Sequence, residues 1–429
     1  MSREMKHSGI EWIGEIPKTW TVNKIGDLYQ IRNEKVSDKD YPPLSVTMNG
    51  IVPQLETAAK TNNGDDRKLV KKGDFAINSR SDRRGSCGVS QYDGSVSLIN
   101  TILTPRNEMN SQFYNWLFHT ELFADEFYKW GHGIVDDLWT TRWQEMKNIS
   151  IVYPSLTEQQ KIADYLDKSC GDIDELITLQ EQMIEELKAY KQSVITEAVT
   201  KGLNPNVPMK DSGIDWIGDI PEHWKIERFK SQFDTGKGLS ITKGDLKPEG
   251  VPVVSYGQIH SKMNTGTRLD ECLIRHIPIE FTENGEASKV RIGDFIFADT
   301  SEDINGCGNA VCVNKDIGLY AGYHTVIAYA KHSENSKYLS YLFLTDCWRS
   351  QIRMRVTGIK VFSISQSILR MASLLLPPLD EQKSISSYLD EKCNEIDTII
   401  TIKQSKIEEL RDYKKSIIYE YVTGKKEVQ

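Results

Sequence analysis

The stretch Ser8-Gly-Ile-Glu-Trp-Ile-Gly-Glu-Ile-Pro-Lys-Thr-Trp20 occurs twice in this chain of 429 residues. Its second copy is Ser212-Gly-Ile-Asp-Trp-Ile-Gly-Asp-Ile-Pro-Glu-His-Trp224. The copies differ only by Glu-to-Asp exchanges and by the pair of residues before the final tryptophan. A repeat with so long a period indicates a duplicated module rather than a solenoid.

A second repeated segment lies further along each copy. Residues 154–160, Pro-Ser-Leu-Thr-Glu-Gln-Gln, match residues 377–383, Pro-Pro-Leu-Asp-Glu-Gln-Lys. The stretches between the repeated segments, 21–153 and 225–376, share little beyond a Gly-Asp-Phe triplet and a Cys-Gly pair. A constant frame therefore carries two divergent inserts.

The constant segments 157–200 and 380–423 are predicted to be long helices. Neither contains proline, and apolar residues recur at steps of four and three, the spacing of a coiled-coil seam. The expected seam of the first helix is Ile162, Leu166, Ile173, Leu176, Met183, Leu187, Tyr190 and Val194. The equivalent stripe of the second helix is Ile385, Leu389, Ile396, Ile399, Leu410, Tyr413 and Ile417. Lysines interrupt this second stripe, so we expect its seam to shift onto Cys393, Ile400 and Ile407.

The ends of both helices carry local signals. Thr157 and Asp380 are typical of helix starts, whereas Gly202 and Gly424 are typical of helix ends. Two similar seams are most simply buried against each other, which predicts an antiparallel pair. The alternative is two separate amphipathic helices, each lying on its own domain.

The inserts have the pattern of mixed α/β domains. Strands are expected at 149–152, 252–255 and 325–328, and one amphipathic helix in each insert, at 112–127 and 337–354. The predicted fold class is α+β: two α/β domains separated by a long antiparallel two-helix coiled coil, with a pseudo-two-fold internal repeat. The predicted ranges are 1–154 for the first motif and insert, 155–203 for the central helix, 204–377 for the second motif and insert, and 378–429 for the last helix.

Composition limits the class of protein. The chain has no apolar run of the roughly 20 residues that span a bilayer and no signal-peptide pattern. Seven scattered cysteines are expected to be free thiols in a reducing cytoplasm. The net charge of −8 is opposite to the usual footprint of a DNA-binding protein, so local clustering of cations has to decide that question.

Motifs of catalysis are missing from the sequence. It contains no Asn-Pro-Pro-aromatic sequence of an adenine methyltransferase, no GxxxxGK[ST] phosphate loop and no HExxH zinc motif. Cys307 and Cys312 lack metal-ligand spacing. We therefore expect a non-catalytic chain that binds no cofactor or metal. The alternatives are an enzyme whose catalytic residues are unrecognised, and a coiled-coil scaffold with protein-binding inserts and no DNA role.

Polar loops in both inserts are candidates for DNA contact, because arginine, lysine, asparagine and small hydroxyl residues bind phosphates and base edges. In the first insert the candidates are Lys60, Asn62, Asn78, Ser79, Arg80, Arg83, Arg84, Thr141 and Arg142. In the second they are Lys237, Ser240, Thr242, Lys243, Tyr256, Gln258, His260, Lys262 and Lys360. A solvated turn is the alternative for any one of them. The repeated tryptophans are expected to lock each insert onto the helix pair.

The duplicated tryptophan motif, the Pro-Pro-Leu-Asp-Glu-Gln helix start and the alternation of variable regions with long helices resemble the specificity subunits of type I restriction-modification enzymes. The resemblance spans essentially the whole chain. It implies two target recognition domains, each binding half of a bipartite site in double-stranded DNA. It also implies a helix pair that sets the spacing and docks two modification subunits, which are adenine methyltransferases, and through them restriction subunits. Such a phage-defence complex uses S-adenosylmethionine, ATP and Mg²⁺.

Overall fold

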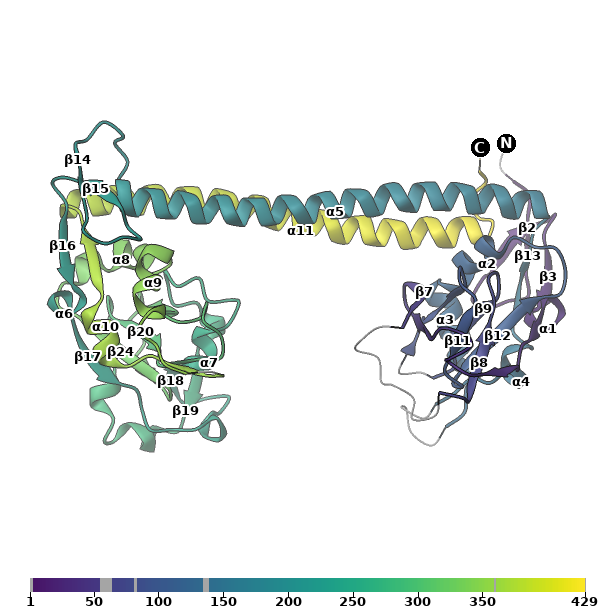
Figure 1. Ribbon diagram of the computed structural model, residues 1–429, viewed down its shortest axis with the longest axis horizontal. Helices are drawn as coiled ribbons and strands as arrows, with labels where there is room; N and C mark the ends of the chain where they lie inside the picture. Colours follow the sequence, from purple (N-terminus) through teal and green to yellow (C-terminus); the bar gives the residue numbers. More distant parts are fainter. Residues whose placement is uncertain (1–2, 55–63, 81–82, 134–138, 359, 429) are drawn as a thin grey trace. The chain divides into compact units, whose positions relative to one another are not determined.

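The computed structural model describes residues 3–54, 64–80, 83–133, 139–358 and 360–428. The chain divides into two compact units (Figure 1). Unit 1 comprises residues 1–181 and 403–429, and unit 2 comprises residues 182–402. Each unit therefore contains one insert together with part of each long helix.

Unit 1 is built around a four-stranded antiparallel sheet. The strands of the whole unit are β1 (Met5–His7), β2 (Glu15–Pro17), β3 (Thr21–Lys24), β4 (Tyr29–Ile31), β5 (Lys35–Val36), β6 (Leu44–Thr47), β7 (Gly50–Pro53), β8 (Arg67–Val70), β9 (Phe75–Asn78), β10 (Cys87–Val89), β11 (Gly94–Val96), β12 (Asn100–Pro105) and β13 (Ser150–Tyr153). The central order is β10-β9-β12-β4, and a smaller sheet has the order β11-β8-β5. Alternate residues of β9 enter different cores, with Phe75 and Ile77 in one and Ala76 in the other.

Unit 2 repeats the order of the central sheet. Its strands are β14 (Met209–Asp211), β15 (Asp219–Pro221), β16 (Lys225–Arg228), β17 (Phe233–Lys237), β18 (Val251–Val254), β19 (Arg275–Ile277), β20 (Phe295–Ala298), β21 (Thr300–Ser301), β22 (Ala310–Cys312), β23 (Tyr320–Ala321), β24 (Thr325–Ala330), β25 (Phe362–Ser363) and β26 (Ser373–Leu376). The central order β22-β20-β24-β17 matches that of unit 1, and β20 likewise divides its residues between two cores. The smaller sheet, β19-β18-β23, differs from that of unit 1 by a parallel pair, β18 with β23. The strands expected near 149–152, 252–255 and 325–328 are confirmed as β13, β18 and β24.

The shorter helices flank these sheets (Figure 1). They are α1 (Ile25–Leu28), α2 (Ser111–Phe118), α3 (Glu121–Lys129), α4 (Trp143–Met146), α6 (Phe229–Gln232), α7 (Tyr256–Ile259), α8 (Ser336–Leu342), α9 (Asp346–Arg353) and α10 (Gln366–Met371). Short 3₁₀ helices span Lys243–Asp245, Glu271–Leu273, Ile279–Thr282, Glu286–Ser288 and Ser333–Asn335. The long helices are α5 (Leu156–Lys201) and α11 (Leu379–Val422).

The single amphipathic helix expected in each insert is wrong, because two helices stand in its place. In unit 1 the hydroxyl of Thr120 accepts from the N–H of Phe123 at 3.2 Å and donates to the carbonyl of Leu117 at 2.8 Å. In unit 2 Thr345 stands between α8 and α9, and its hydroxyl donates to the carbonyl of Leu342 at 2.6 Å. Threonine side chains that bond to nearby backbone groups compete with helix continuation.

The helices α2 and α8 connect the inserts to the long helices. In unit 1 Gln112 and Trp116 of α2 both donate to Oδ1 of Asp167 on α5, each at 2.8 Å. In unit 2 the hydroxyl of Tyr341 on α8 donates to Oδ1 of Asp390 on α11 at 2.6 Å. The two aspartates occupy matching positions in the repeated segments. The insert of each unit is therefore fixed to the same point of the repeated frame.

The long helices pack together, which confirms the predicted pair, but three of the eight residues in the seam expected for α5 are exposed. Leu176, Met183 and Tyr190 are 46%, 36% and 58% exposed. The buried or half-buried seam of α5 runs instead through Cys170, Ile177 and Ile184. Both stripes are apolar and share every second position, so the partner helix decides which one is covered.

In α11 the expected shift of the seam is confirmed. Cys393 and Ile407 are each 6% exposed, and Ile400 is half-buried. Ile399 and Tyr413, which belonged to the unshifted stripe, are 42% and 55% exposed. The seams of α5 and α11 thus use matching positions of the two repeats.

Ion pairs between the two helices follow the same repeat. In unit 1 the ammonium of Lys414 lies 2.7 Å from both carboxylate oxygens of Asp174. In unit 2 the ammonium of Lys191 lies 2.7 Å from both oxygens of Asp397. Lys191 matches Lys414 in the repeat, and Asp174 matches Asp397. Each repeat therefore supplies the lysine of one pair and the aspartate of the other, as an antiparallel two-fold arrangement requires.

The last tryptophan of each motif joins the start of one long helix to the end of the other. In unit 1 the indole of Trp20 is fully buried, donates to Oε1 of Glu158 at 3.1 Å and packs against Gly424. In unit 2 Trp224 donates to Oε1 of Glu381 at 3.2 Å and packs against Gly202. The predicted role of these tryptophans in locking the insert to the helices is confirmed.

The ends of the long helices agree only in part with the sequence signals. Gly202 and Gly424 have φ values of 76° and 74°, so both predicted helix ends are confirmed. Thr157 and Asp380 lie inside the helices, so both predicted caps are wrong. Ser155 caps α5 instead, because its hydroxyl accepts from the N–H of Glu158 at 3.3 Å.

Candidate DNA interface

The loop after β9 in unit 1 lies beside the segment 139–142. Thr140 exchanges two backbone hydrogen bonds with His132, each of 3.0 Å, and also forms a β-bridge with Arg80. The N–H of Thr141 donates to the carbonyl of Ser79 at 3.0 Å. Two segments that were separate candidates in the sequence are therefore neighbours on one surface.

Burial separates the predicted contacts of unit 1 into two groups. Asn78, Ser79 and Thr141 are only 6%, 5% and 0% exposed. The hydroxyl of Ser79 shares a 3.0 Å hydrogen bond with Thr101, and that of Thr141 donates to the carbonyl of Phe127 at 2.8 Å. These side chains hold the loop in place from below.

The remaining described candidates of unit 1 are exposed arginines: Arg80, Arg83, Arg84 and Arg142. Arg84 forms an ion pair with Asp125 of α3, which partly neutralises it. Lys60 and Asn62 lie outside the described residues. The exposed guanidinium groups make this surface of unit 1 locally basic despite the acidic chain.

The matching loop of unit 2 follows β20 and comprises residues 299–306. It contains no lysine or arginine and carries three carboxylates. Its backbone position is the same, because Asp299 accepts from the N–H of Ile364 at 2.7 Å just as Ser79 accepts from Thr141 in unit 1. This loop was not predicted from the sequence, because its acidic composition hides its equivalence to the arginine loop.

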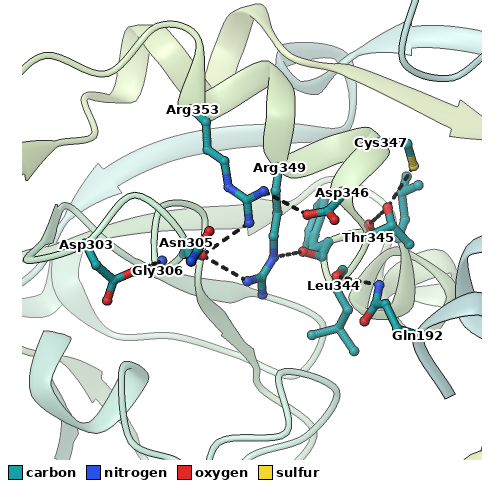
Figure 2. Close-up of polar contacts among 12 residues, drawn as sticks. Gln192, Asp303, Asn305, Gly306, Leu344, Thr345, Asp346, Cys347, Arg349 and Arg353 are labelled. Atoms are coloured by element: carbon teal, nitrogen blue, oxygen red, sulfur yellow. Dashed lines mark hydrogen bonds and ion pairs between the residues drawn. The ribbon is translucent and has the colours of Figure 1, made fainter. Parts of the chain in front are cut away.

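Two arginines of α9 hold this acidic loop (Figure 2). Arg349 and Arg353 both donate to the carbonyl of Asn305, at 3.5 and 3.3 Å. Arg353 also donates to Oδ1 of Asp346 at 2.8 Å. These cations support the loop from the side of α9.

Arg349 is also part of the core-facing side of α9. Its Nε donates to the carbonyl of Phe343 at 2.9 Å, and burial lowers its pKa to about 10. The guanidinium therefore stays charged at neutral pH. Beside it, Gln192 of α5 donates to the carbonyl of Leu344 at 3.2 Å (Figure 2), so the start of α9 is connected to the long helix.

Among the other predicted contacts of unit 2, Lys237 ends β17 and Lys243 begins a 3₁₀ helix, and the rest lie in loops or on and beside α7. The exposed ones are Lys237, Ser240, Thr242, Lys243, Lys262 and Lys360. Thr242 is engaged locally, because its N–H and hydroxyl donate to Oδ2 of Asp245 at 2.7 and 2.8 Å. These hydrogen bonds lower the pKa of the Asp245 carboxyl.

The predicted residues Tyr256, Gln258 and His260 lie on or beside α7 and are half-buried. Nε2 of His260 is 2.8 Å from the carbonyl oxygen of Thr300, and Nδ1 is 3.1 Å from the amide nitrogen of Asn309. These partners assign the ring proton to Nε2. Gln258 accepts from the backbone N–H of the residue before α7 at 3.1 Å. His260 therefore positions α7 against β21, whereas Gln258 caps the start of α7.

Residues 321–324 of unit 2 connect the segments that carry its predicted contacts. Their backbone accepts from the N–H groups of Leu239, Tyr256 and Asp299 at 2.9, 3.3 and 3.1 Å. Their own N–H at Gly322 donates to the carbonyl of Val254 at 2.7 Å. The loop that follows β17, α7 and the acidic loop 299–306 thus meet at one turn.

This convergence depends on glycine. A Cβ at Gly238 would lie 1.9 Å from the carbonyl oxygen of Gly322, and a Cβ at Gly322 would lie 2.1 Å from Oγ of Ser255. No periodic or motif signal distinguishes these glycines in the sequence. The sequence signal that could have revealed the equivalence of the two loops is the shared Gly-Asp-Phe triplet, which aligns β20 with β9 and hence the loops that follow them.

Three further observations concern the described part of the chain. No group of three or more His, Cys, Asp or Glu residues there is arranged to hold a metal ion. Among the same residues no helix is both long and apolar enough to cross a membrane. The seven cysteines are free thiols, and burial raises the pKa of six of them, including Cys87.

Both halves of the chain match one family model. Residues 17–189 and 221–410 each match the type I restriction modification DNA specificity domain. The chain belongs to this family. It is a specificity subunit of a type I restriction-modification system, with two target recognition domains, and the predicted resemblance and fold class are confirmed.

Individual relatives agree over nearly the whole length. The MjaVIII specificity subunit of Methanocaldococcus jannaschii is 25% identical, and the alignment covers 96% of this chain and 93% of the relative. A structure described as the basis of complex assembly and conformational transition of the type I R-M system has a TM-score of 0.70 at 15% identity, covering 95% of this chain and 98% of that one. The HsdS subunit of Thermoanaerobacter tengcongensis has a TM-score of 0.53 at 16% identity, with the same coverage. These structures share the fold.

Proposed function

We propose that each unit binds one half of a bipartite target in double-stranded DNA and that the chain itself catalyses no reaction. The observation that carries this proposal is the repetition of one specificity domain around two inserts with different exposed loops. One chemistry would favour two similar sites, whereas two different half-sites require two different surfaces. Base edges are distinguished by the side chains presented to them, and phosphate contacts supply most of the affinity.

The paired helices are proposed to dock two modification subunits in the cytoplasm. These subunits would methylate adenine with S-adenosylmethionine, and restriction subunits would join through them and use ATP and Mg²⁺. The support is apolar surface on the helices away from their seam: Leu176 and Leu179 of α5 are 46% and 48% exposed, and Ile402 of α11 is 63% exposed. Exposed apolar groups of this kind are typical of protein interfaces.

Sequencing of methylated DNA tests the proposal. The chain would be expressed with its cognate modification subunit in cells that lack other adenine methylation. We expect one methylated motif with two defined halves, and no such motif from the modification subunit alone. Methylation by the purified chain alone with S-adenosylmethionine, or a motif without a gap, would contradict it.

An exchange of inserts tests the assignment of one unit to one half-site. Replacing residues 21–153 with the insert of a relative should change one half of the motif and leave the other intact. Simultaneous change of both halves would show that the units do not act separately.

The spacing role of the helices has its own test. Residues 180–186 and 403–409 are matching heptads of the two helices, so duplicating both keeps the seams in register. The insertion adds about 10 Å at ~1.5 Å per residue. Since DNA rises about 3.4 Å per base pair, the gap between half-sites should grow by about three base pairs. An unchanged gap would show that the helices do not set it.

A further inference from the structure

One turn occupies the same place in both units and differs completely in chemistry. In unit 1 the turn before β12 is Leu98–Ile99, and in unit 2 the turn before β24 is Tyr323–His324. The first loop residue after β9 donates its N–H to the carbonyl of Ile99 at 3.4 Å, and the first after β20 donates to that of His324 at 3.1 Å. These hydrogen bonds place both turns beside the loops described above.

The turn of unit 1 presents apolar side chains to solvent. Leu98 and Ile99 are 40% and 37% exposed, although the strand that follows them is buried. They adjoin the loop that carries Arg80, where DNA phosphates would be bound. In the major groove the one apolar feature of the bases is the methyl group of thymine. Adjacent exposed aliphatic side chains match that group.

The turn of unit 2 has an unusual backbone. Among the residues that the structure describes, His324 is the one non-glycine residue with positive φ, at 54°. This left-handed conformation is sterically disfavoured for residues with a Cβ, and glycine would adopt it without strain. Strained residues of this kind concentrate at functional sites.

The imidazole of His324 is oriented by its neighbours. Its Nδ1 lies 3.3 Å from Oδ1 of Asp299, which also accepts from the hydroxyl of Thr300 at 2.7 Å. The rings of Tyr256 and Tyr323 meet it edge to face, with centroids 5.4 and 5.9 Å away. A carboxylate at Nδ1 favours the tautomer protonated there, which makes Nε2 an acceptor. The side chain is 58% exposed.

We propose that these two turns are specificity-determining elements of the two half-sites. Leu98 and Ile99 contact a thymine methyl group in one half-site, and Nε2 of His324 accepts from the exocyclic amino group of adenine or cytosine in the other. The inference rests on the proposed function and goes beyond it, because it assigns base readout to residues outside the basic loops. Asp299 acts as a positioning residue that fixes the imidazole.

Two variants test the contacts without disturbing the fold. His324→Gly removes the imidazole at a backbone position that suits glycine, and the double variant Leu98→Ala, Ile99→Ala shortens exposed side chains. Each would be expressed with the modification subunit, and the methylated motif sequenced. Removal of one good base contact weakens discrimination roughly 5- to 150-fold at one position. We expect that effect at one position in the unit 2 half for the first variant, and at a thymine in the unit 1 half for the second.

A third variant tests the orientation of the ring. Asp299→Asn keeps the size of the side chain and allows its amide to donate to Nδ1, which moves the ring proton to Nε2. The preferred base at the same position should then extend to those that present an acceptor, guanine or thymine. An unaltered preference would show that Asp299 does not set the tautomer.

Matched controls and a separate readout distinguish failure of this inference from failure of the proposed function. Tyr92→Ala and Ile317→Ala remove side chains that are 45% and 39% exposed on other turns of the two units, and should leave the motif unchanged. The inference would be overturned if the methylated motif stayed unchanged in the His324 variant and in the Leu98/Ile99 variant. It would also be overturned if either variant relaxed the base preference in both halves of the motif. If the unaltered chain directs no bipartite motif, it is the proposed function that fails.

Discussion

The loop after β9 and the loop after β20 occupy the same position in two copies of one sheet, yet their surfaces have opposite charge. The first carries Arg80, Arg83 and Arg84, whereas the second has only acidic and neutral side chains. The same backbone hydrogen bonds, at Ser79 and Asp299, hold both loops to the neighbouring segment. The frame therefore fixes where a loop lies and leaves its chemistry free, as loops on rigid scaffolds commonly do.

The largest effect expected from this comparison is on the shared frame. Trp20→Ala and Trp224→Ala each remove a fully buried indole, so each should destabilise its unit by about 3–5 kcal/mol. The two destabilisations should be similar because the packing around both indoles is repeated. Calorimetric unfolding of both variants would measure them, with Trp130→Ala, 38% exposed, as the control. A large difference between them would mean that the units do not depend equally on the frame.

A second prediction concerns the close backbone approach between Gly238 and Gly322 in unit 2. Gly238→Ala places a Cβ against the carbonyl of Gly322 and should cost about 1–3 kcal/mol through overpacking. Gly257→Ala is the control, because a Cβ there has no neighbour within 4 Å. Urea denaturation checks the difference. Equal stabilities of the two variants would show that this close approach does not limit the packing of the turn.

A third prediction sharpens the contrast in charge. The double variant Arg80→Ala, Arg83→Ala should bind DNA with a weaker salt dependence. The magnitude of the slope of the logarithm of the binding constant against the logarithm of the salt concentration should fall by about 0.9 for each phosphate that is no longer neutralised. Glu302→Lys should increase it by a similar amount, because it introduces a cation in the matching loop of unit 2. Fluorescence anisotropy of the complex at several salt concentrations measures both slopes. Arg411→Ala on α11 is the charge-matched control and should change neither slope.

The smallest effect is expected in the helix pair. Lys191 and Lys414 occupy seam positions and are only 27% and 25% exposed. Leucine at either position should stabilise the pair by up to ~1 kcal/mol, because an exposed ion pair contributes less than apolar packing at a seam. Thermal unfolding would test both variants. Destabilisation by either would show that the ion pair contributes more than its solvent exposure indicates.

The sequence predicted the repeated parts of the molecule better than the unique ones. Trp20 and Trp224 follow from a motif that occurs twice, and such motifs reflect packing that both copies share. The shifted seam at Cys393 follows instead from the lysines that interrupt the stripe of the second helix. The exposed Leu176 and Tyr190 were misplaced because two overlapping apolar stripes satisfy the same spacing. The positive φ of His324 and its carboxylate partner could not be predicted, since both arise only when three distant segments meet.

The packing of Trp20 has an evolutionary consequence. This tryptophan belongs to the first repeat and packs against Gly424 at the end of the second, while Trp224 of the second repeat packs against Gly202 of the first. The boundary of a folded unit is thus out of phase with the boundary of the duplicated gene segment. Neither gene half encodes a complete unit, so selection acts on both halves together. Recombination within the repeated segments can exchange an insert while Trp20, Trp224, Gly202 and Gly424 are retained.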